Sequence, residues 1–132
     1  MLSLTVFGDM APIVLPYAED REMEIGGDFA QYTMSSSIHF ATPQSRGDFM
    51  VHSPSSNRFY ISVSIVDPAT QKSIMYTGAI PPGETRDNIK LDIPLENGVY
   101  ECIAEITAYD LDDIGRLLGR ETRDITLYVG EK

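Results

Sequence analysis

The strongest constraint on the fold is a period of two in two segments of the chain, in which every second side chain is apolar. In residues 58–66 and 99–109, the alternate members are Phe59, Ile61, Val63 and Ile65, and then Tyr100, Cys102, Ala104, Ile106 and Ala108. A β-strand directs successive side chains to opposite faces, whereas a helix has a period of 3.6 residues. Both segments are therefore predicted to be β-strands with one face in a core and the other toward water.

Further segments share this alternation or are rich in β-branched residues, and turn residues separate them. They lie at residues 2–7, 21–25, 48–52, 72–76, 89–93 and 122–129, with residues 12–17 as an edge strand or an extended crossing. The segment 29–40 is ambiguous, because a run of three serines interrupts its strand-like parity. Residues 111–118 have the 3,4 spacing of leucine and isoleucine that predicts one or two helical turns. This pattern predicts an all-β fold, an immunoglobulin-like antiparallel β-sandwich of seven to nine strands with Greek-key connections.

The length of the chain indicates how many domains it forms, and its net charge limits the kinds of partner that it can bind. A chain of 132 residues is expected to form a single domain, 1–132, in which the strands within residues 1–47 are the least clearly marked. Its net charge of −10 repels phosphate groups, so nucleic acid and anionic membrane surfaces are not expected partners. No apolar stretch is long enough for membrane insertion. A single cysteine excludes an internal disulfide, which fits either the cytoplasm or the exterior of a Gram-positive cell.

The segment 95–102 resembles the tyrosine corner of immunoglobulin-like domains. It contains Leu95, an acidic residue, Gly98, Tyr100 and then Cys102. The resemblance implies that the Tyr100 hydroxyl bonds back to the backbone just upstream and fixes the crossing between two sheets. The partner cysteine and the core tryptophan of antibody domains are absent, so an antibody-type domain is not expected.

A wider resemblance extends over residues 48–130. Its elements are the strand beginning at Phe49, the prolines and glycine of 80–83, Gly98 with Tyr100, and the final strand. This order of strands and turns resembles small uncharacterised β-sandwich ectodomains of Gram-positive bacteria, which implies an extracellular or cell-surface location and no assigned activity. The first 47 residues are not covered, and residues 1–18 do not have the pattern expected for the signal peptide of that family. A cytoplasmic location is the alternative.

Two short motifs are candidate binding sites. Arg46-Gly47-Asp48 spells the integrin-recognition tripeptide, although a glycine here also serves an ordinary turn. Asp110, Asp112, Gly115 and Glu121 occupy positions 1, 3, 6 and 12 of a calcium-loop pattern. Position 5 of that pattern is Ile114, and strands are expected on both sides, so a solvated hairpin loop is the alternative.

Other reactive side chains give no catalytic pattern. His39, His52 and Cys102 could supply at most three metal ligands without close spacing, and Cys102 is expected to be a small buried apolar residue. Tyr60 and Tyr128 fall opposite the apolar parity of their strands. They could form an exposed aromatic platform that stacks on sugars, or pack at the edges of the sheets.

These observations predict a protein without enzymatic activity or cofactor, a surface or extracellular module that binds another protein. Strand addition at an exposed sheet edge is the expected mode of binding. The alternatives are a carbohydrate-binding domain and a structural protein of a phage or mobile element. The sequence does not predict the oligomeric state or the identity of the partner.

Overall fold

The fold consists of β-strands joined by turns and loops. A computed structural model describes residues 18–25, 28–87, 89–93, 95–113 and 115–130, and it contains no helix within these ranges. The strand expected at residues 2–7 and the extended segment at 12–17 lie outside the described residues. The all-β prediction is confirmed for the part of the chain that is described.

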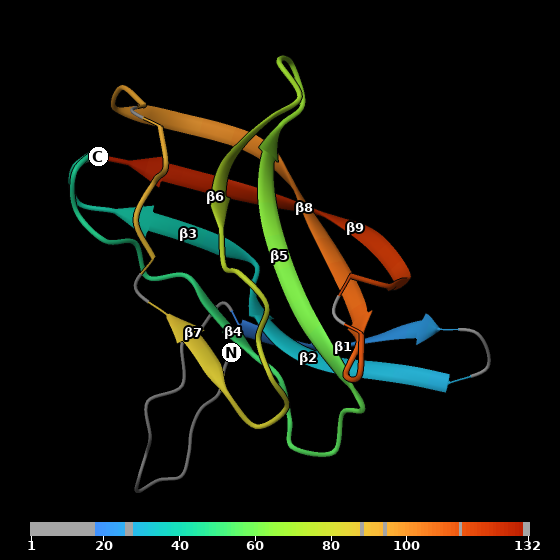
Figure 1. The fold of residues 1–132 in the computed structure, drawn as a ribbon. Helices are drawn as coiled ribbons and strands as arrows, with labels where there is room; N and C mark the ends of the chain where they lie inside the picture. Colours follow the sequence, from blue (N-terminus) through green and yellow to red (C-terminus); the bar gives the residue numbers. More distant parts are fainter. Residues whose placement is uncertain (1–17, 26–27, 88, 94, 114, 131–132) are drawn as a thin grey trace, which may run out of the picture.

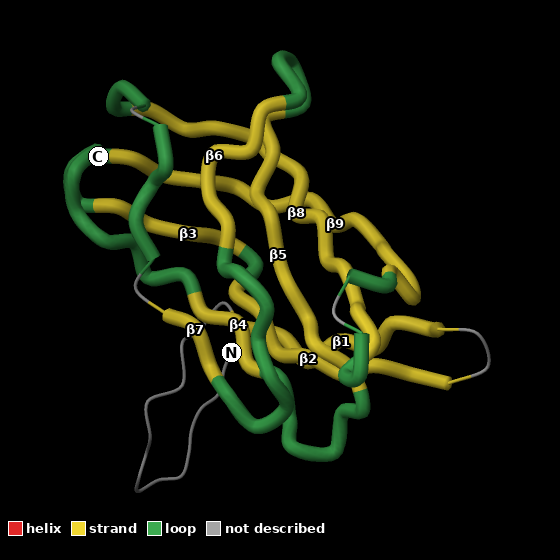
Figure 2. The backbone as a smooth tube through the Cα atoms, viewed as in Figure 1, coloured by secondary structure: helices red, strands yellow, loops and turns green. Residues whose placement is uncertain are grey.

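Nine strands form two sheets in the described part (Figures 1 and 2). They are β1 (Ala18–Ile25), β2 (Asp28–Ser35), β3 (Ser37–Phe40), β4 (Met50–His52), β5 (Phe59–Asp67), β6 (Lys72–Tyr76), β7 (Thr85–Asp87), β8 (Gly98–Asp110) and β9 (Leu117–Val129). One sheet has the order β1-β2-β4-β7 and the other has the order β3-β9-β8-β5-β6. All neighbours are antiparallel except β3 and β9, which run parallel.

The core lies between the sheets, and the two alternating segments found in the sequence are neighbouring strands of the second sheet that turn their apolar rows toward it. The predicted inward row of β5 is buried, and so are all members of the β8 row except Tyr100, which is half-buried. Antiparallel pairing with β9 runs along nearly the whole of β8 and aligns the alternate side chains of the two strands. The predicted burial of alternate residues is thus confirmed in β5 and in Cys102–Ala108 of β8.

The ambiguous segment 29–40 proves to be two strands in different sheets. β2 belongs to the first sheet and β3 to the second, and a bend at Ser36 joins them. Tyr32 and Phe40 are both buried, so the inward parity of the segment continues through the bend. The serines that interrupt the pattern therefore mark the point where the chain passes from one sheet to the other.

Two expectations about secondary structure are wrong. Residues 111–118 contain no helix: Leu117 and Leu118 begin β9, and the described residues between Leu111 and Arg116 form the bends and turn that connect β8 to it, with Ile114 outside the described residues. The reason is the long hairpin of β8 and β9, which pairs Tyr109 with Leu117 and so uses backbone groups that a helix would need.

The segment 89–93 is not a strand either. The Ile89 carbonyl accepts a hydrogen bond from the Gly47 N–H (3.0 Å), whereas the Asp92 N–H donates to the Ile74 carbonyl in β6 (2.8 Å). Its backbone is therefore divided between two partners, although Leu91 still packs against the core as the alternation predicts. The short strand β7 was not anticipated, because Thr-Arg-Asp carries no apolar pattern.

Candidate functional site

The outer edge of β1 is the longest sheet edge that no described residue pairs with. β1 has eight residues, whereas β7 at the other edge of the same sheet has three. In the second sheet, β3 is covered by Asp48, which bonds to His39 through its N–H (3.2 Å) and its carboxylate (2.7 Å). β6 is covered where the Asp92 N–H reaches Ile74.

The sequence of β1 gives its two faces different chemistry. Asp20, Glu22 and Glu24 are exposed on the outer face of the sheet, while Met23 and Ile25 are buried on the inner face. Together with Glu19, the strand has four carboxylates and a single guanidinium, that of Arg21. Charged side chains on an edge strand are a common protection against unspecific pairing, and they also select the charge of a partner strand.

Two of the three acidic residues on the outer face accept hydrogen bonds from the neighbouring strand β2. Thr33 donates a hydrogen bond to Asp20 (2.6 Å), and the Gln31 side chain donates to Glu22 (3.3 Å). Next to them lies a shallow hollow of about 600 Å³, which extends across the sheet to His52. These contacts keep two carboxylates in fixed positions along the edge.

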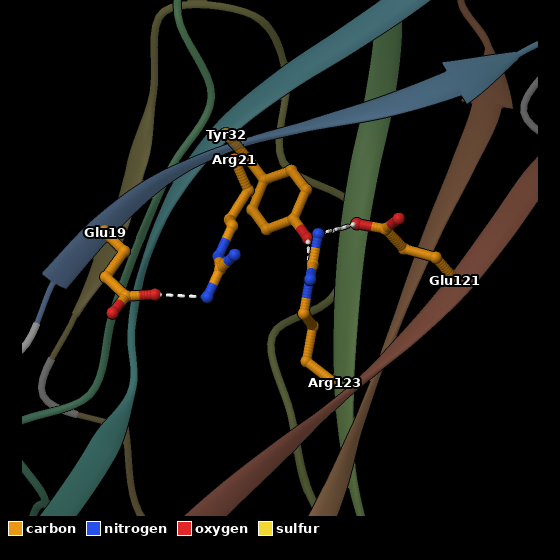
Figure 3. A network of polar contacts seen from close by, with 5 residues as sticks. All are labelled: Glu19, Arg21, Tyr32, Glu121 and Arg123. Atoms are coloured by element: carbon orange, nitrogen blue, oxygen red, sulfur yellow. Dashed lines mark hydrogen bonds and ion pairs between the residues drawn. The ribbon is translucent and has the colours of Figure 1, made fainter.

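On the inner side of β1, a second hollow of about 400 Å³ opens toward β9. Its lining comes from three strands and the bend at Ser36, and consists of Glu19, Arg21, Met34, Ser35, Ser36, Thr122, Arg123 and Asp124. Figure 3 shows that Glu19 and Arg21 form an ion pair at its β1 side. The hollow is polar, with charges of both signs on its walls.

A part-buried polar cluster, of which Arg123 also lines this hollow, links the two sheets (Figure 3). The Tyr32 hydroxyl donates to Glu121, and Arg123 contacts both the Tyr32 oxygen (Nε, 3.4 Å) and Glu121 (Nη2, 3.4 Å). Burial is the main cause that raises the pKa of Tyr32 to about 12, so its hydroxyl keeps its proton and remains a donor at neutral pH. The hydrogen bond with Tyr32 is the main cause that raises the pKa of Arg123 above its ordinary value.

The predicted calcium ligands do not converge. Asp110 ends β8, whereas Glu121 in β9 lies opposite Ile106. Four residues of strand separate these positions, or about 13 Å. Asp110 instead accepts the Asp112 N–H (2.8 Å), and Glu121 is engaged with Tyr32. The described residues contain no group of three potential metal ligands.

The Arg46-Gly47-Asp48 tripeptide is part of a packed segment rather than a projecting tip. Arg46 forms a β-bridge with Lys90, and Asp48 is bonded to β3. Gly47 is buried, and a Cβ atom at this position would lie 2.7 Å from the ring of Phe40. Close packing against β3 therefore requires a glycine at this position. This packing explains the residue without a receptor-binding role.

The remaining candidates are distributed over the molecule. His39 lies in β3 beside the ring of Tyr128 (4.8 Å between centroids), whereas His52 lies in the other sheet, with Nδ1 at 2.8 Å from the Thr85 hydroxyl. Cys102 is buried as predicted, and this burial is the main cause that raises its pKa to about 11. Its thiol is thus protonated at neutral pH and inert as a nucleophile.

Tyr60 and Tyr128 do not form one platform. Tyr60 pairs with Tyr109 near the end of β8, and Tyr128 pairs with Val99 near its start. Ten residues of strand separate these pairs, or about 30 Å. Tyr128 is 38% exposed and Val99 is 62% exposed, so they form a small apolar patch with His39 instead.

Tyr100 does reach back to the backbone upstream. Its hydroxyl donates to the Glu96 carbonyl at 2.6 Å. Gly98 lies against the Tyr100 ring, with a φ of 158° that is extended backbone, and Leu95 packs against the core.

The sequence did not reveal the edge position of β1 or the cluster of Tyr32, Glu121 and Arg123. The four carboxylates of β1 were a usable signal, because alternating charges are typical of an edge strand. The cluster left no local signal, since Tyr32 and Glu121 are 89 residues apart.

Comparisons with protein-family models, with curated proteins and with solved structures found no match to this chain. No helix in the described ranges has the length and apolar character needed to cross a bilayer.

Proposed function

We propose that this chain is a non-catalytic protein-interaction module with an immunoglobulin-like β-sandwich fold, and that it binds its partner by strand addition at β1. The observation that carries the proposal is the eight-residue edge of β1, which pairs only with β2 among the described residues. Strand addition supplies main-chain hydrogen bonds to such an edge, and pockets beside it select alternate side chains of the partner. The hollow at Arg21 is a pocket of this kind.

The strand order supports the immunoglobulin-like fold. Along the chain, β4 to β9 correspond to strands B, C, C′, E, F and G of a variable-type domain. The neighbours β4-β7 and β9-β8-β5-β6 then match B-E and G-F-C-C′. Tyr100 lies near the start of β8, two residues before Cys102, where strand F has its corner tyrosine.

The chemistry of the reactive side chains favours binding over catalysis. The Cys102 thiol is buried and protonated, and the two histidines belong to different sheets. The acidic residues Asp20 and Glu22 are exposed and hydrogen-bonded to β2, as expected for a recognition surface. The cell surface is the proposed setting, on the resemblance of residues 48–130 to Gram-positive ectodomains.

Selection of random peptides on the full-length chain tests this proposal. Selected peptides should lose affinity when the β1 edge is blocked by proline. Adjacent residues of an edge strand direct their N–H groups in opposite directions, so one of Arg21→Pro and Glu22→Pro blocks the edge while the other breaks the pairing with β2. The informative variant is the one whose melting temperature equals that of the parent, because its pairing with β2 is intact.

The matched control is Glu101→Gln on the outer face of the second sheet, which should bind the peptides unchanged. Peptides that bind the edge-blocked variant as tightly as the parent would overturn strand addition at β1. If all selected peptides bound the Glu101→Gln variant more weakly than the parent, the interaction surface would lie on the second sheet instead of at β1.

A further inference from the structure

The outer edge of β1 has a charge pattern that defines the partner it accepts. We infer that this edge binds an extended segment of another protein with lysine or arginine at every second position. The inference rests on the proposed strand addition and adds to it the chemistry of the partner strand. It is carried by the exposed carboxylates of Asp20, Glu22 and Glu24, which lie on one face of the sheet.

The spacing of these carboxylates fixes the spacing of the complementary charges. Residues of one face recur every second position, and directly opposed side chains of paired strands have Cβ atoms about 5 Å apart. A strand added beside β1 therefore places alternate side chains opposite Asp20, Glu22 and Glu24. Basic residues at those positions would form a row of ion pairs, two of them with carboxylates that Thr33 and Gln31 already orient.

The other side chains of an added strand face the interior side of the sheet. Near Arg21 they meet the hollow of about 400 Å³, which has room for a side chain and polar groups to bind it. Near Ile25 the space is closed, because a Cβ atom on Gly119 of β9 would already lie 3.3 Å from Ile25 Cγ1. The inward residues of the partner are therefore expected to be long and polar at the Arg21 end and small at the Ile25 end.

Charge argues against a second copy of this chain as the occupant. Two β1 strands paired antiparallel about a two-fold axis would bring the acidic row of one copy against the acidic row of the other. Like charges directly opposed across a pair of strands are destabilising. The net charge of −10 adds a general repulsion between copies.

The probe for this inference is an octapeptide of alternating lysine and threonine, and its matched control is the same peptide with glutamate in place of lysine. With the full-length chain, the lysine peptide should slow hydrogen exchange at alternate amides of β1, and the glutamate peptide should not. Its affinity should fall with added salt, because the pairs are exposed.

The triple variant Asp20→Asn, Glu22→Gln and Glu24→Gln keeps the shape of the edge and removes its charge. It should bind the lysine peptide at least about tenfold more weakly than the parent, as three exposed cross-strand charge pairs predict. The control is Glu101→Gln combined with Glu105→Gln, which removes charge from the outer face of the second sheet and should leave the affinity unchanged.

Several results would overturn the inference. Slow exchange at every β1 amide of the free monomer would mean that residues of its own chain occupy the edge, and slow exchange only at high concentration would identify a second copy. Equal affinity of parent and triple variant, or no binding of the lysine peptide, would exclude a basic strand. Selected peptides that bind β1 without basic residues would overturn this inference while leaving the proposed function intact.

Discussion

The hydroxyl of Tyr32 in β2 donates a hydrogen bond to the carboxylate of Glu121 in β9, so that a buried ring of one sheet is tied to a charged residue of the other. Arg123 lies within 3.4 Å of both groups and balances the charge of Glu121. Arg123 also lines the hollow on the inner side of β1, so the cluster holds one wall of the proposed binding site in place. Its hydrogen bonds therefore serve the stability of the fold and the geometry of the proposed site together.

Removal of the Tyr32 hydroxyl should destabilise the protein measurably. Tyr32→Phe keeps the buried ring but leaves Glu121 with one donor fewer, and a hydrogen bond to an ionised group contributes about 2 kcal/mol. Urea unfolding should show a loss of this size in the free energy of unfolding, with an unchanged m-value. Tyr128→Phe is the control, because that side chain is 38% exposed and its change should cost less than about 0.5 kcal/mol. Equal effects of the two substitutions would contradict the role of the cluster.

Alkaline pH should weaken the fold through Tyr32 and Cys102. Burial raises the pKa of Tyr32 from 10.0 to about 12 and that of Cys102 from 9.0 to about 11. Between pH 9 and 12 the unfolded chain therefore releases protons that the folded chain keeps, and the free energy of unfolding falls as pH rises. Below pH 9 the contribution of both groups is complete. The slope is at most about 1.4 kcal/mol per pH unit for each group.

The combined variant Tyr32→Phe and Cys102→Ala provides the check on this pH dependence. It should lose stability less steeply than the parent between pH 9 and 12, whatever its stability at neutral pH. Urea titrations at a series of pH values measure the difference. Identical slopes in parent and variant would show that other groups cause the alkaline loss.

Calcium should have no effect on thermal stability. A ligand that binds only the folded state raises the melting temperature, and the predicted ligands Asp110 and Glu121 are held apart by the pairing of β8 with β9. Melts in EDTA and in millimolar calcium chloride should therefore coincide. A higher midpoint in calcium that disappears in Asp112→Asn would restore the loop as a site.

Local pattern was sufficient for the strands that span the core. The strands β5 and β8 can be predicted without knowing which strands pair with them, because alternate residues in their sequences are apolar and nearly all of these are buried on one face of the sheet. The pattern failed at 89–93, where inward side chains alternate as in a strand but backbone hydrogen bonds go to two different partners. The burial of side chains and the pairing of backbone groups are separate properties. Only burial produces a periodic pattern of apolar residues in the sequence.

The candidate site depends on strand order, which no local pattern reports. Residues 21–25 were predicted as a strand, but its position at an edge follows from pairing with β2 alone among the described residues. The spacing of Glu121 from Asp110 predicts a calcium loop, whereas the contact of Glu121 with Tyr32 forms only when both sheets are assembled. Long-range contacts of this kind decide which polar residues become a site.

Substitution of Gly47 tests whether the Arg-Gly-Asp segment is a packed element. A methyl group at Gly47 would approach the Phe40 ring to 2.7 Å and Ile38 Cγ2 to 2.9 Å, so Gly47→Ala should cost about 1–3 kcal/mol of stability through overpacking. Gly115→Ala is the control, because its nearest neighbour would be Asp113 Oδ1 at an ordinary 3.6 Å. Thermal melts of the two variants should differ by several degrees. If Gly47→Ala melted like the control, the segment would be loose enough to present Arg46 and Asp48 to a receptor.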